Sequence, residues 1–455
     1  MTKPKKPKIV LAPMNIASMP IQIVNALKKN GYTAEQAAYT TGEGHKFGYE
    51  MDREFNVKEH GGRIKTHALA LREYLNRDFD IYHFWNKSMF FEGQYGHLTG
   101  LDIPLIKARG KRIAYRFTGY DLRLPSWDKQ VNPHSPFHHG YEHIFDEELQ
   151  KKYLGFLEEY VDQFLVQDPE MAQFAPKGTK IIPRALDLEK WDVVGIENND
   201  VPLVVHAPSN KAVKGTAFIM KAVTELLDEG LKFTFKPITG MKHAQAKEWY
   251  AKSDIIIDQI MIGATGVLTL EAWALGKPCV VYLREDLFKD FYKCSELPIA
   301  NATPDTIKDQ LRKLIKDYEW RQDLSKRGRK TVERFHDADK VVKKFIMTYE
   351  GMMKRKPVIP KGTKDVDYLQ AQAEASQRLS VLNNVKTRQV AKLNLDLKNA
   401  KVVDTADLAQ RMSGPEKLDL IGKILPAAIS KPISWGYALK KTVKPGKVKP
   451  VKDAG

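Results

Sequence analysis

The feature that most constrains the fold is an alternation of short apolar runs with amphipathic segments, repeated twice along the 455 residues. A run of four or five apolar residues suits a buried strand, and the segments between runs have helical periodicity. This alternation predicts parallel sheets covered by helices. A chain of this length exceeds one typical core, which favours two domains. In the first half we expect strands at residues 9–12, 80–84, 112–115, 163–166 and 180–182.

A polar stretch at residues 195–200 interrupts the alternation, which then starts again. We therefore expect a Rossmann-like domain over residues 1–195, a second over residues 200–353, and a basic helical or extended tail over residues 354–455. The expected fold class is α/β, with two doubly wound domains facing a cleft. Ligands in such sheets bind beyond the carboxyl ends of the strands. The expected strands of the second domain are 203–206, 233–235, 254–257 and 279–282.

Composition narrows the classes of protein to consider. No apolar run approaches the roughly 18 residues of a membrane-spanning helix, so we expect none. The two cysteines, Cys279 and Cys294, have neither metal-site spacing nor a disulfide framework, which favours the cytoplasm. The net charge of +17 is uneven: residues 351–455 hold 21 Lys and Arg against 9 Asp and Glu, and the rest of the chain holds 52 against 47. The basic character therefore belongs mainly to the tail and bears on where the protein sits.

The first candidate binding segment, residues 206–216, runs from a strand into a loop with two lysines and then into a helix. Backbone N–H groups at a helix start, together with lysines, suit a diphosphate. The alternative is a solvated loop with surface lysines. The candidate donor-binding residues of this segment are Asn210, Lys211, Lys214, Gly215 and Thr216.

The second candidate segment, residues 258–278, joins a strand to a glycine-containing loop and then to an apolar helix. Glycines allow backbone to approach a ligand closely, and a helix N-terminus favours phosphate. A carboxylate inside an apolar helix is costly unless it is paired or holds hydroxyl groups. The alternative for this carboxylate is a salt bridge to a nearby lysine. The candidate residues are Asp258, Gln259, Gly263, Gly266 and Glu271.

These two segments resemble the C-terminal domain of retaining GT-B glycosyltransferases of glycosyltransferase family 4. The matching motifs are Lys-Gly-Thr at residues 214–216 and Leu-Glu-Ala-Trp-Ala-Leu-Gly-Lys-Pro at residues 270–278. The first half adds residues 102–111 and 116–123, so the resemblance covers roughly residues 8–352. It implies that Lys214 contacts the donor diphosphate and that Glu271 holds the donor ribose.

The chain departs from the family pattern at two positions. The family's first glutamate, eight positions before the second, is replaced by Gly263, and its interdomain histidine is replaced by Thr118. The remaining polar residues near the carboxyl ends of first-domain strands are therefore the candidates on that side. A structural salt bridge or strand-end cap is the alternative for each. We expect Arg116, Asp121 and Arg123 as catalytic residues and His83 on the acceptor side.

The resemblance implies chemistry without a metal or cofactor, because basic side chains and a helix dipole stabilise the donor phosphates. Two Asp-x-Asp sequences occur, at residues 78–80 and 365–367. The first precedes a strand, away from the expected cleft, and the second lies in the tail. We expect no metal site.

The expected function is transfer of a sugar from a nucleotide sugar to a glycan, lipid-linked or protein acceptor, with retention of configuration. The alternatives are a nucleotide-sugar epimerase, a catalytically inactive binding or scaffold protein, and a transferase that modifies nucleic acid. The last would show steep salt dependence of binding, but the body is nearly neutral, and we do not expect a nucleic-acid partner.

The tail carries lysines interleaved with apolar residues at 418–439. Such a segment suits an anionic membrane surface, where each lysine contributes about 1 kcal/mol. Docking on a partner protein and a solvated extension are the alternatives. The expected location is cytoplasmic, with peripheral attachment at the inner face of the membrane as an option.

Overall fold

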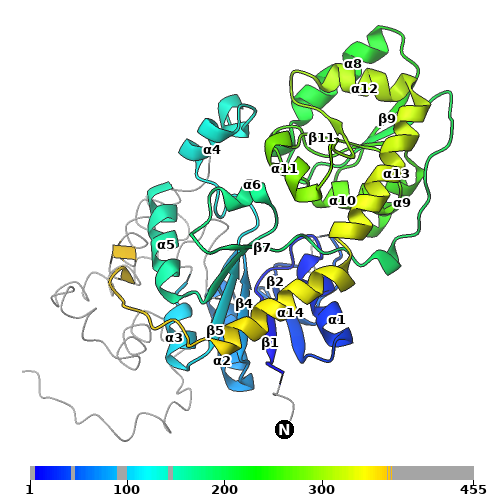
Figure 1. Ribbon diagram of the computed structural model, residues 1–455. Coiled ribbons are helices and arrows are strands. Elements are labelled where there is room, and N and C mark those ends of the chain that lie inside the picture. Colours follow the sequence, from blue (N-terminus) through cyan, green and yellow to red (C-terminus); the bar gives the residue numbers. More distant parts are fainter. Residues whose placement is uncertain are drawn as a thin grey trace, which may run out of the picture.

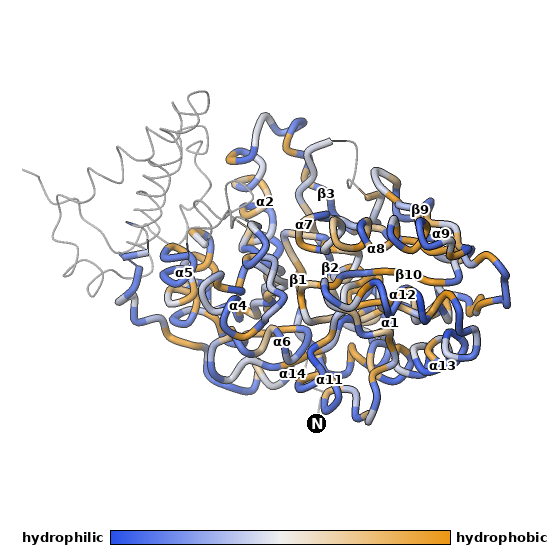
Figure 2. Tube along the Cα trace, turned by 90° about the horizontal axis from the view of Figure 1, so that it is seen from above, coloured by the Kyte–Doolittle hydropathy of each residue, from blue (hydrophilic) through white to orange (hydrophobic). Residues whose placement is uncertain are grey.

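The computed structural model describes residues 6–42, 47–89, 100–141, 147–365, 367–368 and 370. Two α/β units follow one another along the chain, each built around its own sheet (Figure 1). Figure 2 shows the hydrophobic residues on inner strands such as β1 (Ile9–Ala12) and β10 (Ile255–Ile257), whereas α13 (Tyr318–Phe335) is largely hydrophilic. The alternation in the sequence thus becomes buried strands under amphipathic helices.

The first unit contains a seven-stranded sheet in the order β3-β2-β1-β4-β5-β6-β7. Every neighbouring pair of strands is parallel. The expected list omitted two strands, because β2 and β3 carry alanine and polar residues rather than apolar runs. The remaining strands are β2 (Ala34–Thr40), β3 (Arg53–Asn56), β4 (Ile81–Trp85), β5 (Arg112–Arg116), β6 (Gln163–Val166) and β7 (Lys180–Ile181). The helices are α1 (Met19–Lys29), α2 (Arg63–Arg77), α3 (Ile103–Ala108), α4 (Pro125–Val131), α5 (Glu147–Tyr160) and α6 (Pro169–Ala172), with 3-10 turns at Pro136–His139 and Leu188–Lys190.

The second unit contains a five-stranded parallel sheet in the order β12-β11-β10-β8-β9. The strand order reverses between β8 and β10, as it does between β1 and β4 in the first unit. Such reversal points are where doubly wound sheets bind ligands. The strands are β8 (Leu203–His206), β9 (Thr234–Pro237), β11 (Cys279–Val281) and β12 (Ala300–Asn301). The helices are α7 (Lys211–Lys214), α8 (Thr216–Asp228), α9 (His243–Lys252), α10 (Val267–Ala274), α11 (Glu285–Tyr292), α12 (Ile307–Lys316) and α14 (Ala338–Lys354).

Helix α14 leaves the second unit and packs on the first, which differs from the expected boundary at residue 353 (Figure 1). Its Tyr349 hydroxyl lies 2.7 Å from Nδ1 of His83 on β4. The Arg112 Nε donates to the carbonyl of Met352 over 3.1 Å. The buried apolar face of α14, which includes Val341, Val342 and Phe345, packs against α1.

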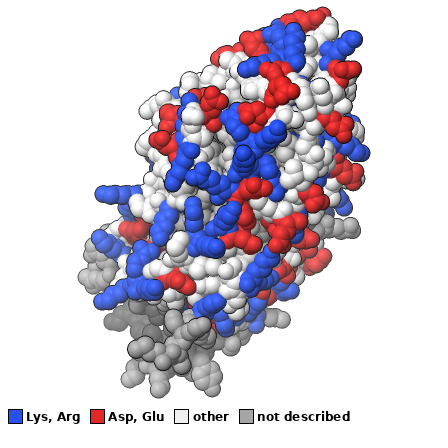
Figure 3. Space-filling model, turned by 45° about the vertical axis from the view of Figure 1, so that its right-hand side comes forward, with Lys and Arg blue, Asp and Glu red and all other residues white. Residues whose placement is uncertain are grey.

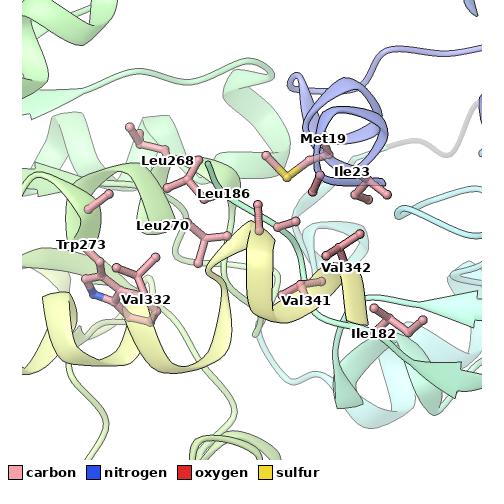
Figure 4. Packing of buried hydrophobic residues seen from close by; sticks show 14 of the residues in the cluster. Met19, Ile23, Ile182, Leu186, Leu268, Leu270, Trp273, Val332, Val341 and Val342 are labelled. Atoms are coloured by element: carbon pink, nitrogen blue, oxygen red, sulfur yellow. The ribbon is translucent and has the colours of Figure 1, made fainter. Parts of the chain in front are cut away.

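One hydrophobic cluster runs through both units (Figure 4). Met19 and Ile23 of α1 lie near Val342 of α14. Trp273 of α10 lies near Val332 of α13 at the other end of the cluster. The two sheets are therefore joined by a continuous apolar core beneath the cleft.

The packed structure continues past residue 354, where we expected the tail to begin. Tyr368 is buried and stacks on Phe156 of α5, with ring centroids 4.6 Å apart. The Tyr160 hydroxyl donates to Asp365 over 2.6 Å. Residues 371–455, on which the membrane, partner-protein and solvated-extension expectations depend, lie outside the described residues. Within the described part, no helix has the length and apolarity needed to cross a membrane.

Candidate functional site

A cavity of about 350 Å³ lies between the carboxyl ends of the two sheets. Both reversal points contribute to it, through the β1–α1 loop and β4 on one side and through the segments after β8 and β10 on the other. The residues that line it and enter the following argument are Tyr49, Trp85, Arg116, Thr118, Arg123, Arg184, Lys214, His243, Gln259, Gly266 and Glu271.

Lys214 reaches the cavity from the last position of the short helix α7. Its Nζ donates to Asp258 Oδ1 and to Gln259 Oε1, each over 2.7 Å. Gly215 then turns the chain into α8 with φ of 76°. A Cβ at Gly215 would lie 2.6 Å from Ile260 Cγ1, so a glycine is needed at this turn. The turn fixes Lys214 beside the residues that follow β10.

Asp258 is fully buried and organises the start of α10. Its Oδ2 accepts from the hydroxyl of Thr269 over 2.7 Å and from the Thr269 amide over 3.2 Å. Burial alone would raise the pKa of this carboxyl, but Lys214 and Thr269 together hold it below its usual value. A Cβ at Gly266 would lie 2.2 Å from Asp258 Oδ2. Asp258 therefore acts through Lys214 and the α10 N-terminus, and Gly266 makes room for it.

Glu271 lies one turn inside α10 and lines the cavity. Its Oε1 is 2.7 Å from Nε2 of His243, the first residue of α9. The alternative of a salt bridge to lysine is therefore wrong in this structure, since the partner is a histidine. His243 was not among the expected site residues, because no motif in residues 241–252 indicates a binding role. The pair forms only when α9 and α10 pack together.

Six of the expected donor-binding residues do not line this cavity: Gly215 and Asp258, described above, and Asn210, Lys211, Thr216 and Gly263. Asn210 caps α7, with its Oδ1 accepting from the amides of Ala212 and Val213. Lys211 is exposed on α7. Gly263 has φ of 77°, and a Cβ there would lie 3.0 Å from Arg284 Cγ, so this glycine serves packing inside the second unit. The remaining residue of the turn, Thr216, bonds Nε2 of His206 through its hydroxyl over 2.9 Å.

The first unit contributes Arg116, which is buried at the end of β5 and lines the cavity. Its Nη2 donates to the carbonyl of Ile182 over 2.9 Å, and its guanidinium lies 4.7 Å from the centroid of the Trp85 ring. Burial and the nearby Arg184 lower its pKa to about 9. Among the described residues, its Nη1 has no hydrogen-bond partner. Arg116 is thus a cation held against the cavity wall.

Arg123 and Asp121 have structural partners. Arg123 forms a bidentate, buried ion pair with Glu170 of α6, with 2.8 Å between Nε and Oε1. Burial alone would lower the pKa of Arg123, but Glu170 raises it above its usual value. Asp121 accepts from the amides of Thr118 and Gly119 and caps that turn, while its burial raises its pKa to about 6.

His83, expected on the acceptor side, does not line the cavity. Its side chain is fully buried beneath α14, bonded to Tyr349 and packed against Phe345. Burial and then Arg116 lower its pKa well below the usual value. No part of this side chain is exposed, and it is not among the residues that line the cavity. Strand periodicity alone did not reveal which face α14 covers.

A segment of the first unit reaches across to the second beside the cavity. Asn132 Nδ2 donates to the carbonyl of Met261 over 2.8 Å, in the loop that follows β10. The ring of His134 meets that of Tyr282 edge-on, with centroids 5.1 Å apart. No sequence pattern indicates this bridge, because it depends on how the two units sit together. Among the described residues, no group of three or more His, Cys, Asp or Glu could hold a metal ion.

No protein-family model and no curated protein matches the chain. Solved structures do match its fold. Sucrose-phosphate synthase from Thermosynechococcus elongatus aligns over 77% of this chain and 100% of its own, with 13% identity and a TM-score of 0.55. The catalytic domain of starch synthase IV from Arabidopsis thaliana, bound to ADP and acarbose, aligns over 77% and 100%, with 12% identity and a TM-score of 0.54. A glycosyltransferase from Rickettsia africae aligns over 78% and 100%, with 12% identity and a TM-score of 0.50. With its two parallel sheets and flanking helices, the chain has the GT-B fold.

Proposed function

We propose that this protein is a glycosyltransferase that uses a nucleotide sugar as donor. The observation that carries the proposal is the meeting of Lys214, Glu271 and the N-terminus of α10 in one cavity at the reversal points of both sheets. The ammonium group of Lys214 and the dipole at the start of α10 suit a diphosphate, and the carboxylate of Glu271 suits the hydroxyl groups of a ribose. The GT-B fold supports the same reading, because the solved neighbours include a starch synthase domain bound to ADP.

In the proposed reaction, Lys214 and the amide groups at the start of α10 stabilise the leaving nucleoside diphosphate. Asp258 and Gln259 hold the Lys214 ammonium in place before the donor binds. Such preorganised charge is worth more in a site that excludes water than in solution. Glu271 accepts hydrogen bonds from the ribose hydroxyls. We propose transfer with retention of configuration and without a resident metal or cofactor.

The acceptor would lie against the first unit, near Arg116, Thr118 and Arg184. Arg116 and Arg184 make this wall cationic, although Arg184 is paired with Asp168 over 2.9 Å. A glycan or lipid-linked acceptor fits this side. Attachment of residues 371–455 to a membrane surface or a partner protein in the cytoplasm is a further part of the proposal. Acidic and basic side chains intermingle over the face shown in Figure 3, which gives no support to a nucleic-acid acceptor.

One observation favours a second candidate, a nucleotide-sugar-binding protein without turnover. Two positions that carry catalytic side chains in the resembling family hold Gly263 and Thr118 here. Arg123 and Asp121, the nearest replacements, are engaged in structural contacts. Binding of a nucleotide sugar with no hydrolysis or transfer would favour this candidate.

The test is a hydrolysis and transfer screen with UDP-, GDP-, ADP-, TDP- and CMP-sugars, repeated with Lys214→Ala and Glu271→Ala. Each variant should lower kcat/KM by about 10²–10³, the usual loss for a preorganised contact to developing charge. Lys221→Ala is the matched control, because Lys221 is exposed on α8 away from the cavity. Wild-type turnover in both cleft variants, with unchanged melting temperatures, would show that the assignment is wrong.

A further inference from the structure

We infer that His243 is a positioning residue for the donor, which holds the Glu271 carboxylate at the cleft; this inference rests on the proposed function. The two side chains meet at 2.7 Å between Nε2 and Oε1 and both line the cavity. The Glu271 side chain is only 8% exposed, whereas that of His243 is 26% exposed. A carboxylate buried to this degree needs a polar partner, and the imidazole supplies it.

The imidazole is itself held by residues of the first unit. The His243 amide donates to the carbonyl of Phe47 over 3.1 Å, which fixes the start of α9. The ring of Tyr49 meets the imidazole edge-on, with centroids 5.3 Å apart. The ring of Trp191, in the segment that joins the units, also meets the imidazole edge-on, with centroids 6.1 Å apart. Glu271 is therefore connected to both units through His243.

The geometry leaves one carboxylate oxygen for the ligand. His243 engages Oε1 of Glu271, and among the described residues no hydrogen bond engages Oε2. A hydrogen bond at one oxygen fixes the plane of the carboxylate, so the second oxygen keeps a defined direction toward the cavity. Ribose hydroxyls would meet an acceptor that is already oriented, which lowers the entropic cost of binding.

Charge gives the pair a pH dependence with a definite sign. Burial alone would lower the pKa of His243, but its hydrogen bond to Glu271 and the carboxylate charge raise it above the usual value, against a smaller opposing effect of Lys247. The titratable side chain of Tyr49 also faces the ring. Below this pKa the imidazolium neutralises Glu271 near the donor phosphates. As the pH rises through it, the carboxylate loses its counter-charge, and binding of an anionic nucleotide should weaken.

Two variants distinguish a positioning role of His243, through its hydrogen bond to Glu271, from a role in which the side chain only fills space. Calorimetric titration with UDP, GDP, ADP and TDP first identifies the nucleoside diphosphate that wild-type protein binds. For that probe, His243→Ala should raise Kd by about tenfold, since a hydrogen bond to a charged group is lost. His243→Gln places an amide N–H near the position of Nε2 and should stay within about threefold of wild type. In turnover, His243→Ala should raise the donor KM while changing kcat by less than about threefold.

A second experiment compares the Kd for the same nucleoside diphosphate in wild type and His243→Gln between pH 6 and 8. Ionisation of the probe is common to both proteins, so the additional weakening seen only in wild type at high pH reports His243. Lys252→Ala, on the exposed face of α9, is the control and should leave Kd unchanged. Unchanged Kd in His243→Ala, a Gln variant as weak as the Ala variant, or identical pH profiles would overturn the inference and leave the proposed function standing. Failure of wild-type protein to bind any of the four probes would overturn both.

Discussion

The two walls of the cleft use their charged side chains differently. On the second unit, Lys214 and His243 keep 14% and 26% of their side chains exposed. On the first unit, Arg123 keeps 6% and is closed into an ion pair with Glu170, which is 3% exposed. A charge beside a cavity therefore does one of two jobs: it presents itself to a ligand, or it fixes the wall. The partner, rather than the residue type, decides between them.

The largest expected effect is a difference in the free energy of unfolding between a variant of the wall-fixing Arg123 and a variant of the ligand-facing Lys214. Arg123→Ala leaves Glu170 buried without a counter-charge, and breaking a buried pair in this way costs about 3–5 kcal/mol. Lys214→Ala leaves Asp258 with its two Thr269 hydrogen bonds, so we expect a smaller cost of about 1–2 kcal/mol. Urea unfolding of both variants measures the difference.

The double variant Arg123→Met with Glu170→Met is the control for this prediction. It removes both charges together, so it should recover most of the stability lost in Arg123→Ala. If Arg123→Ala unfolded at the wild-type urea concentration, the distinction between the two walls would fail. Arg123 would then have to be reconsidered as a residue that faces substrate.

The comparison also shows which parts of the site were open to prediction from sequence. Lys214 and Glu271 sit on segments where a strand, a glycine turn and a helix follow one another within a few residues. Because these segments follow the carboxyl ends of their strands closely, the local path of the chain is enough to place both residues at the cleft. His83 lies within strand β4 and Arg123 in the loop after β5. Their environment comes from Tyr349 and Glu170, which lie 266 and 47 residues away. No local pattern encodes those contacts.

Most of the fold could likewise be predicted from local sequence patterns. All nine expected strands overlap observed ones, because buried parallel strands are short apolar runs. The strands β2, β3 and β12 were not expected, since β2 is rich in alanine and polar residues and β12 has only two residues. The return of α14 to the first unit was missed for another reason. Helical periodicity gives the apolar face of a helix but not the surface that covers it.

A smaller effect should come from the glycine that makes room for Asp258. Gly266→Ala forces Asp258 to move, because the new Cβ would lie 2.2 Å from Oδ2. The carboxylate would then lose its contacts to Thr269 and Lys214. Overpacking of this kind costs about 1–3 kcal/mol, and misplacement of Lys214 should weaken nucleotide binding. Thermal unfolding and calorimetric titration measure the two effects.

Gly351→Ala is the matched control for that substitution. Gly351 lies within α14, and a Cβ there meets nothing within 4 Å. Alanine is favoured over glycine in a helix interior by about 0.5–1 kcal/mol, so this variant should be slightly more stable than wild type and bind nucleotide normally. Equal behaviour of the two variants would mean that the close approach of Asp258 to the α10 start does not matter.

The smallest expected effect concerns two lysines on the same turn of helix. Lys211 and Lys214 begin and end α7, and the sequence analysis assigned both to the donor. Only Lys214 lines the cavity, held by Asp258 and Gln259, whereas Lys211 is exposed. A charge in solvent is screened over about 8–10 Å at physiological salt. Lys211→Ala should therefore change donor kcat/KM by less than about threefold, and that change should disappear at high salt. A loss as large as that of Lys214→Ala, persisting at high salt, would mean that α7 turns Lys211 into the cleft when the donor binds.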